Sequence, residues 1–87
     1  MTKEELVIGK RYCFNPVLNT HSNDISDAFV VRLSSGYHYI GTDKVWVLLS
    51  ARFILKDFVT MSILLPNAEI ATVKSFPINL IRLADKE

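Results

Sequence analysis

The chain has 87 residues, of which 49% are hydrophobic and 22% charged, and its net charge is +1. This length supports one small hydrophobic core, and the composition is opposite to that of disordered proteins. The longest apolar run, VWVLL at 45–49, is far shorter than the roughly 20 residues of a membrane-spanning helix, and MTKEELVIGK lacks a signal-peptide pattern. We therefore expect one small domain over 1–87 that is soluble, cytoplasmic and not bound to membranes.

The first third of the chain predicts one short helical turn, a strand and a loop. Thr2 and Glu5 in TKEEL fit a capping box, which predicts a single helical turn before the first strand. GKRYCF at 9–14 is strand-like, and its Cys13, the only cysteine, is predicted to be a buried, inert thiol. NPVLNTHSNDISD at 15–27 is polar and predicts a long loop.

The next segment alternates between apolar and polar faces. In DAFVVRL, Phe29, Val31 and Leu33 point to one side and Arg32 to the other, which indicates a strand. Ser-Gly at 35–36 is turn chemistry, and GYHYIG follows as the next strand at 36–41.

Residues 43–57 allow two interpretations. Val45, Trp46 and Val47 favour a strand, in which Val45, Val47 and Leu49 share a face opposite Trp46 and Leu48. A helix capped by Thr42 or Asp43 is the alternative, since Lys44, Arg52 and Lys56 would then lie near one side of the helix. That helix would be apolar over most of its remaining surface, so we prefer the strand.

The C-terminal third predicts a hairpin, a turn and a closing strand. Val59, Met61, Ile63 and Leu65 alternate with Thr60 and Ser62, and Pro66-Asn67 marks a turn. Pro77 in SFPINL lacks an N–H for a β-ladder, which predicts a tight or 3₁₀ turn before a last strand, LIRL.

These C-terminal residues, with GKRYCF as first strand, resemble a Tudor- or KOW-type small β-barrel of the Src-homology-three kind. Asn67-Ala68 stands where such hairpins usually have glycine, and the Gly-rich element of KOW segments is missing. We expect an all-β fold, a barrel of five to six strands with one short N-terminal helical turn. The alternative is an α+β fold with a helix at 43–57.

Catalytic and metal-binding patterns are weak in this sequence. His21 and His38 are 17 residues apart with one cysteine in the chain, which does not provide the paired ligands of a zinc site. Ser22, His21 and Asp24 are too close in sequence to form a hydrolytic triad, and no phosphate-binding glycine loop is present. We therefore expect no enzyme activity, cofactor or metal.

The aromatic residues suggest a recognition surface. Tyr37 and Tyr39 are two residues apart and so share a strand face, with Trp46 as a candidate neighbour. Such rings either bind a partner or form part of the core. Our first hypothesis is a non-catalytic protein-interaction module, an adaptor or a small inhibitor that blocks a larger partner, which is another protein or a second copy of the chain. Its predicted binding residues are Tyr37, Tyr39, Trp46, His21, Asp24 and Asp27.

The second hypothesis is a nucleic-acid-binding small β-barrel. The basic residues are spread along the sequence, so only folding would gather them into a patch. The predicted phosphate-binding residues around the aromatics are Lys44, Arg52, Lys56 and Lys74.

Overall fold

The computed structural model describes residues 3–19 and 24–84. Over these residues the regular structure is mostly β-strand, with two short 3₁₀ turns. In chain order the elements are η1 (Lys3–Glu5), β1 (Arg11–Phe14), β2 (Val17–Asn19), β3 (Asp24–Ser26), β4 (Ala28–Leu33), β5 (Gly36–Gly41), β6 (Trp46–Leu55), β7 (Phe58–Leu64), β8 (Ile70–Pro77), η2 (Ile78–Leu80) and β9 (Ile81–Leu83).

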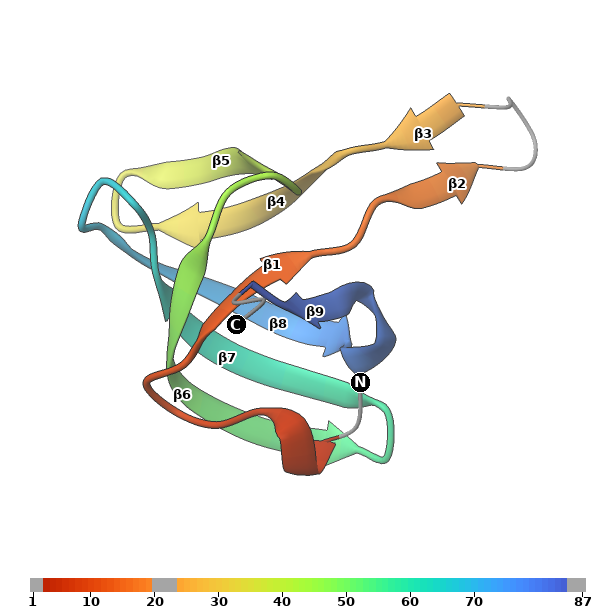
Figure 1. Ribbon diagram of the computed structural model, residues 1–87. Coiled ribbons are helices and arrows are strands. Elements are labelled where there is room, and N and C mark those ends of the chain that lie inside the picture. The colour runs from red at the N-terminus through yellow and green to blue at the C-terminus, as the bar shows by residue number, and fades with distance from the viewer. Residues whose placement is uncertain (1–2, 20–23, 85–87) are drawn as a thin grey trace.

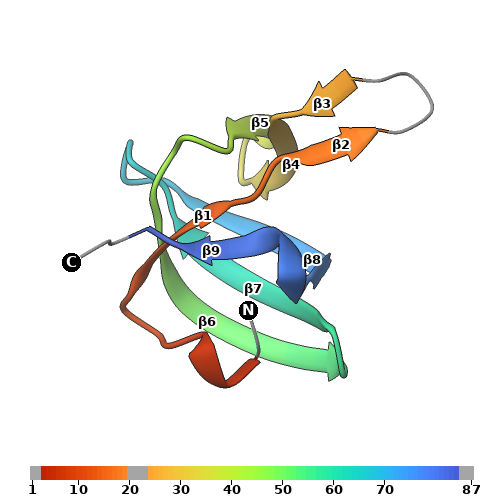
Figure 2. The same cartoon turned by 45° about the vertical axis from the view of Figure 1, so that its right-hand side comes forward.

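Seven strands form one antiparallel sheet in the order β5-β4-β8-β7-β6-β1-β9, and β2 pairs with β3 separately. The sheet curls into a half-barrel, and the β2–β3 hairpin projects from it as an arm (Figures 1 and 2). The all-β prediction is confirmed, although the described strands number nine rather than five to six. Within the described residues, no helix is long and apolar enough to cross a membrane.

The inner face of the curled sheet holds the hydrophobic core. In β7 the side chains of Val59, Met61 and Ile63 are buried, as the alternation predicts. Phe14 lies at the centre of an aromatic cluster, with ring centroids 5.3 Å from Phe29, 4.9 Å from Trp46 and 4.9 Å from Phe76. Pairs at these separations and tilted angles add to the stabilisation from burial alone.

Residues 46–55 form a strand, so the alternative helix at 43–57 is wrong. β6 pairs with β7 from Val47 opposite Leu64 to Leu55 opposite Phe58. The β-branched and aromatic residues at its start suit an extended backbone. A helix at 43–57 would also leave β7 without a paired strand on the side that β6 occupies.

The prediction of a loop over 15–27 is wrong for residues 17–19 and 24–26, which form β2 and β3. β2 and β3 pair through Val17 with Ser26, Leu18 with Ile25, and Asn19 with Asp24. The predicted elements at both ends of the chain are present: η1 is one 3₁₀ turn, and η2 follows Pro77 and leads into β9. Thr2 of the proposed capping box lies outside the described residues.

Candidate functional site

The two tyrosines of β5 are exposed and the tryptophan is not. The Tyr37 and Tyr39 side chains are 72% and 76% exposed, whereas Trp46 is 0% exposed. Trp46 begins β6 and packs against Tyr12 and Phe14 in the core. Its predicted role in partner binding is therefore wrong, because its ring belongs to the inner face of the sheet.

The tyrosines belong to a face whose residues are contributed by five strands. Register places Tyr37 opposite Arg32, Arg32 opposite Thr72, Thr72 opposite Ser62, and Ser62 opposite Ser50. A second row lies two residues away along the strands, with Tyr39 opposite Val30 and Arg52 opposite Thr60. We call this surface the outer face; its residues are Val30, Arg32, Tyr37, Tyr39, Ser50, Arg52, Thr60, Ser62, Thr72 and Lys74.

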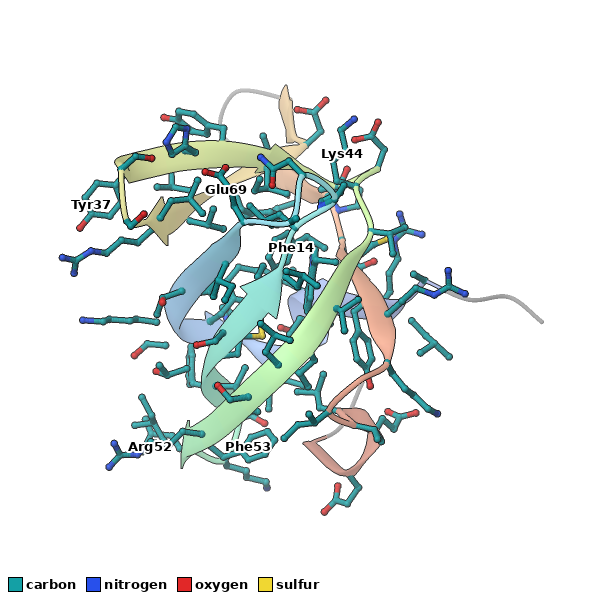
Figure 3. The ribbon with its side chains drawn as sticks, turned by 90° about the vertical axis from the view of Figure 1, so that its left-hand side faces the viewer. Phe14, Tyr37, Lys44, Arg52, Phe53 and Glu69 are labelled. Atoms are coloured by element: carbon teal, nitrogen blue, oxygen red, sulfur yellow. The ribbon has the colours of Figure 1, made fainter. Side chains whose placement is uncertain are left out.

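Charge is unevenly distributed between the strands and the turns. The seven strands of the main sheet contain no Asp or Glu, and Arg32, Arg52 and Lys74 are exposed on the outer face. Acidic residues lie instead in turns, including Asp43, Asp57 and Glu69. Figure 3 shows Tyr37 and Arg52 projecting to the same side of the molecule, with Glu69 at the turn and Phe14 in the interior. The outer face is therefore positively charged although the whole chain is nearly neutral.

A groove of about 370 Å³ opens on this face between β4 and β8. Arg32, Lys74 and Tyr37 line it together with aromatic residues from the core, so that it combines apolar walls with two cations. The full set of lining residues is Phe29, Val30, Arg32, Tyr37, Thr72, Val73, Lys74 and Phe76.

The groove exists because β4 and β8 pair over a very short length. Arg32 opposite Thr72 is their one assigned pair among the described residues. The β7–β8 register shifts between Val59 and Met61, and Ser75 has a positive φ of 50°. The Ser75 N–H donates to a side-chain oxygen of the neighbouring strand β7, Thr60 Oγ1, at 3.1 Å. This bulge lies beside the groove, which is lined by Phe29 and Phe76, whose rings meet edge to face at 5.2 Å.

The four cations predicted to bind nucleic acid fall into two groups. Arg52 and Lys74 lie on the outer face, as described above. Lys44 follows β5 and lines a second hollow of about 270 Å³ with Tyr39. Lys56 lies in the β6–β7 turn at the far end of the sheet. Lys44 and Lys56 are each adjacent in sequence to an aspartate, which reduces their contribution to a positive surface.

Of the acidic and histidine residues predicted to bind a partner, only Asp27 is fully described, and it lies beyond the end of the strand pair that carries the tyrosines. Asp27 is exposed between β3 and β4, at the opposite end of β4 from Arg32, and its carbonyl oxygen accepts from Thr42 N–H at 2.8 Å. Asp24 is in the β2–β3 arm, and nothing is described of its side chain. His21 lies outside the described residues.

A separate apolar surface is present at the end of the β6–β7 hairpin. Phe53, Ile54, Leu55 and Phe58 are all exposed there, within six consecutive positions, and Leu55 is 66% exposed. Exposed apolar residues scattered singly are ordinary, but four in one hairpin end are typical of an interaction site. We call these four residues the apolar tip.

Sequence reasoning missed Arg32 and the aromatic walls of the groove. A signal for Arg32 was present, because a two-residue turn at 34–35 pairs Leu33 with Gly36 and hence Arg32 with Tyr37. The groove had no such signal, since it depends on a bulge and on the separation of two strands distant in sequence. Among the described residues, no group of three or more His, Cys, Asp or Glu is arranged to hold a metal ion.

In comparisons with protein-family models, curated proteins and solved structures, nothing matches this chain at a significant level.

Proposed function

We propose that this protein is a non-catalytic binding module that binds nucleic acid through the outer face. The observation that carries the proposal is the acid-free sheet, on whose outer face Arg32, Lys74 and Arg52 are exposed on β4, β8 and β6 beside the exposed tyrosines of the edge strand β5. Cations neutralise phosphates, while aromatic rings provide flat surfaces on which bases stack. The hydroxyl groups between the cations add hydrogen-bond donors for phosphate oxygens.

The test compares two triple variants that each remove three positive charges. Arg32→Gln, Arg52→Gln and Lys74→Gln together neutralise the outer face, whereas Lys10→Gln, Lys44→Gln and Lys56→Gln neutralise exposed lysines outside it. Binding is measured by fluorescence anisotropy of a labelled oligonucleotide at low salt. We expect the first variant to lose binding and the second to keep most of it. Equal losses in both variants would show that net charge alone drives binding.

Protein binding is the second candidate function, and the apolar tip favours it. In this case the module is an adaptor or a small inhibitor whose partner is another protein or a second copy of the chain. Leu55→Glu places a charge in the apolar tip without touching the core, because Leu55 is largely exposed. We expect the Leu55→Glu protein to enrich no partner in pull-downs, or to stop self-associating in sedimentation experiments. A parent protein that stays monomeric and enriches nothing above background would exclude this function.

The resemblance to Tudor- and KOW-type barrels remains a proposal. Three features support it: the β7–β8 hairpin, the 3₁₀ turn after Pro77, and the pairing of the final strand β9 with β1. This architecture serves many functions, so it does not by itself distinguish a nucleic-acid partner from a protein partner.

A further inference from the structure

The groove between β4 and β8 differs from the rest of the outer face in having depth. Its walls include Phe29, Val73 and Phe76, which belong to the hydrophobic side of the sheet. Its rim carries Arg32, Lys74 and Tyr37. A simple electrostatic surface for a polyanion would need the cations but would not need an aromatic hollow between them.

We propose that this groove holds one unstacked base of a single-stranded nucleic acid, with Arg32 and Lys74 on the adjoining phosphates. The proposal rests on the nucleic-acid function proposed above and names the part of the ligand that this hollow takes. A base in single strands presents its flat face freely, whereas a base in a duplex is stacked between neighbours and is not available to a groove.

Charge complementarity decides which ligand fits. Two cations at the rim repel a cationic side chain, so the groove does not form a cage for lysine or arginine. Among the residues that the structure describes, no Asp or Glu lines it. The ligand therefore has an aromatic or apolar part beside negative charge, which describes a nucleotide within a strand. An acidic peptide containing an aromatic residue has similar chemistry, but it lacks the regular phosphates that Arg52 would meet further along the face.

Tyr37 is positioned to stack on the base or on its neighbour. Its ring is 72% exposed on the edge strand β5, directly opposite Arg32 in the β4–β5 register. An exposed aromatic on a strand beside a cation is the arrangement that sequence-tolerant single-strand binding uses. The preference is expected to be for single strands of any sequence.

The experiment fills the groove without changing charge. Val30 lines the groove and is 48% exposed, while Val45 is 39% exposed and lines neither hollow. Val30→Trp should therefore block a base, and Val45→Trp is the matched control. Labelled oligothymidylate of about 12 nucleotides, a duplex of the same length and heparin are the three probes. Thermal unfolding followed by circular dichroism verifies that each variant is folded.

We expect Val30→Trp to weaken oligothymidylate binding about tenfold, with heparin binding unchanged and Val45→Trp equal to the parent. Tyr37→Leu should weaken oligothymidylate binding and Tyr37→Phe should not. The base-binding role is overturned if Val30→Trp binds the oligonucleotide like the parent, or if the parent binds duplex as tightly as single strands. It is also overturned if an acidic, tyrosine-containing peptide displaces the oligonucleotide at lower concentration than unlabelled oligothymidylate. Absence of binding to all three probes at low salt would instead refute the nucleic-acid function itself.

Discussion

Ala68, in the turn between β7 and β8, has a φ of 70°, in the left-handed region. A side chain with a Cβ is disfavoured there by about 1–2 kcal/mol, whereas glycine adopts this conformation freely. The proposed resemblance to small barrels would place a glycine in this hairpin, and Ala68 has a backbone conformation that favours glycine.

The substitution Ala68→Gly should therefore raise the free energy of unfolding by about 0.5–1 kcal/mol, the strain relief being partly offset by the entropy of glycine in the unfolded chain. Urea unfolding monitored by circular dichroism measures the change. Asn67→Gly is the control. It removes the hydrogen bond in which Asn67 Oδ1 accepts from Glu69 N–H at 3.1 Å, and it relieves no strain because Asn67 does not have a positive φ. A destabilised Ala68→Gly protein would contradict this account of the turn.

The hydroxyl of Tyr12 attaches the N-terminal turn to the barrel. Tyr12 Oη accepts from Val7 N–H at 2.7 Å and donates to the carbonyl oxygen of Glu5 at 2.8 Å, while the side chain as a whole is buried. One side chain thus binds one backbone group at the end of η1 and one in the segment that follows it.

Tyr12→Phe should lower the free energy of unfolding by about 1–2 kcal/mol, since it leaves Val7 N–H and the Glu5 carbonyl without this partner. Tyr37→Phe is the matched control, because its side chain is mostly exposed, and should change stability by less than about 0.5 kcal/mol. Guanidinium unfolding, followed by the fluorescence of the buried Trp46, compares the two. Equal stability of both variants would mean that water replaces the Tyr12 hydroxyl at no cost.

At the level of elements, alternation predicts a strand well when its two faces differ in polarity. β7 has apolar residues on one face and Thr60 and Ser62 on the other, so its buried face could be named in advance. β6 is apolar on both faces near its start. The alternation therefore predicts correctly that Trp46 and Leu48 share a face, but it does not indicate which face is buried. The prediction that Trp46 lies on the surface is wrong, because both side chains are buried.

The β2–β3 arm and the groove required information that local sequence does not hold. Asn19, Asp24 and Ser26 have low strand propensity, and their pairing depends on partners across the hairpin. The groove depends on the bulge at Ser75, which is set by the contact between β7 and β8. Local propensity therefore accounted for most strands, whereas the pairing of distant segments determined the candidate site.

The bulge in β8 has its own test. Thr60→Val removes the acceptor for Ser75 N–H while keeping a β-branched side chain, and should lower the free energy of unfolding by about 0.5–1.5 kcal/mol. Thr72→Val, on the same face and also half-buried, is the control, since no hydrogen bond of its hydroxyl is found among the described residues. Thermal unfolding distinguishes them, and amide exchange at Ser75 should rise in Thr60→Val alone. Unchanged exchange there would show that this bond does not hold the bulge.

For the whole molecule, a net charge of +1 conceals an uneven distribution. Turns carry most of the acidic residues that the structure describes, and the strands of the main sheet carry none. Over distances comparable to the Debye length of about 8 Å at physiological salt, a ligand on the outer face is influenced mainly by nearby cations rather than by the average charge. Strand pairing decides which side chains share a face. It therefore determines where positive charge is concentrated on the surface of the molecule.

This distribution predicts how binding depends on salt. If Arg32, Arg52 and Lys74 each neutralise one phosphate of a single strand, the logarithm of the binding constant should fall against the logarithm of salt concentration with a slope of about −2. Arg52→Gln should reduce the slope to about −1.4, because one fewer counterion-releasing contact is made. Lys56→Gln removes the same charge in the turn beside Asp57 and should leave the slope near −2. If both variants reduced the slope equally, binding would depend on the total charge of the protein, and the outer face would not be the binding site.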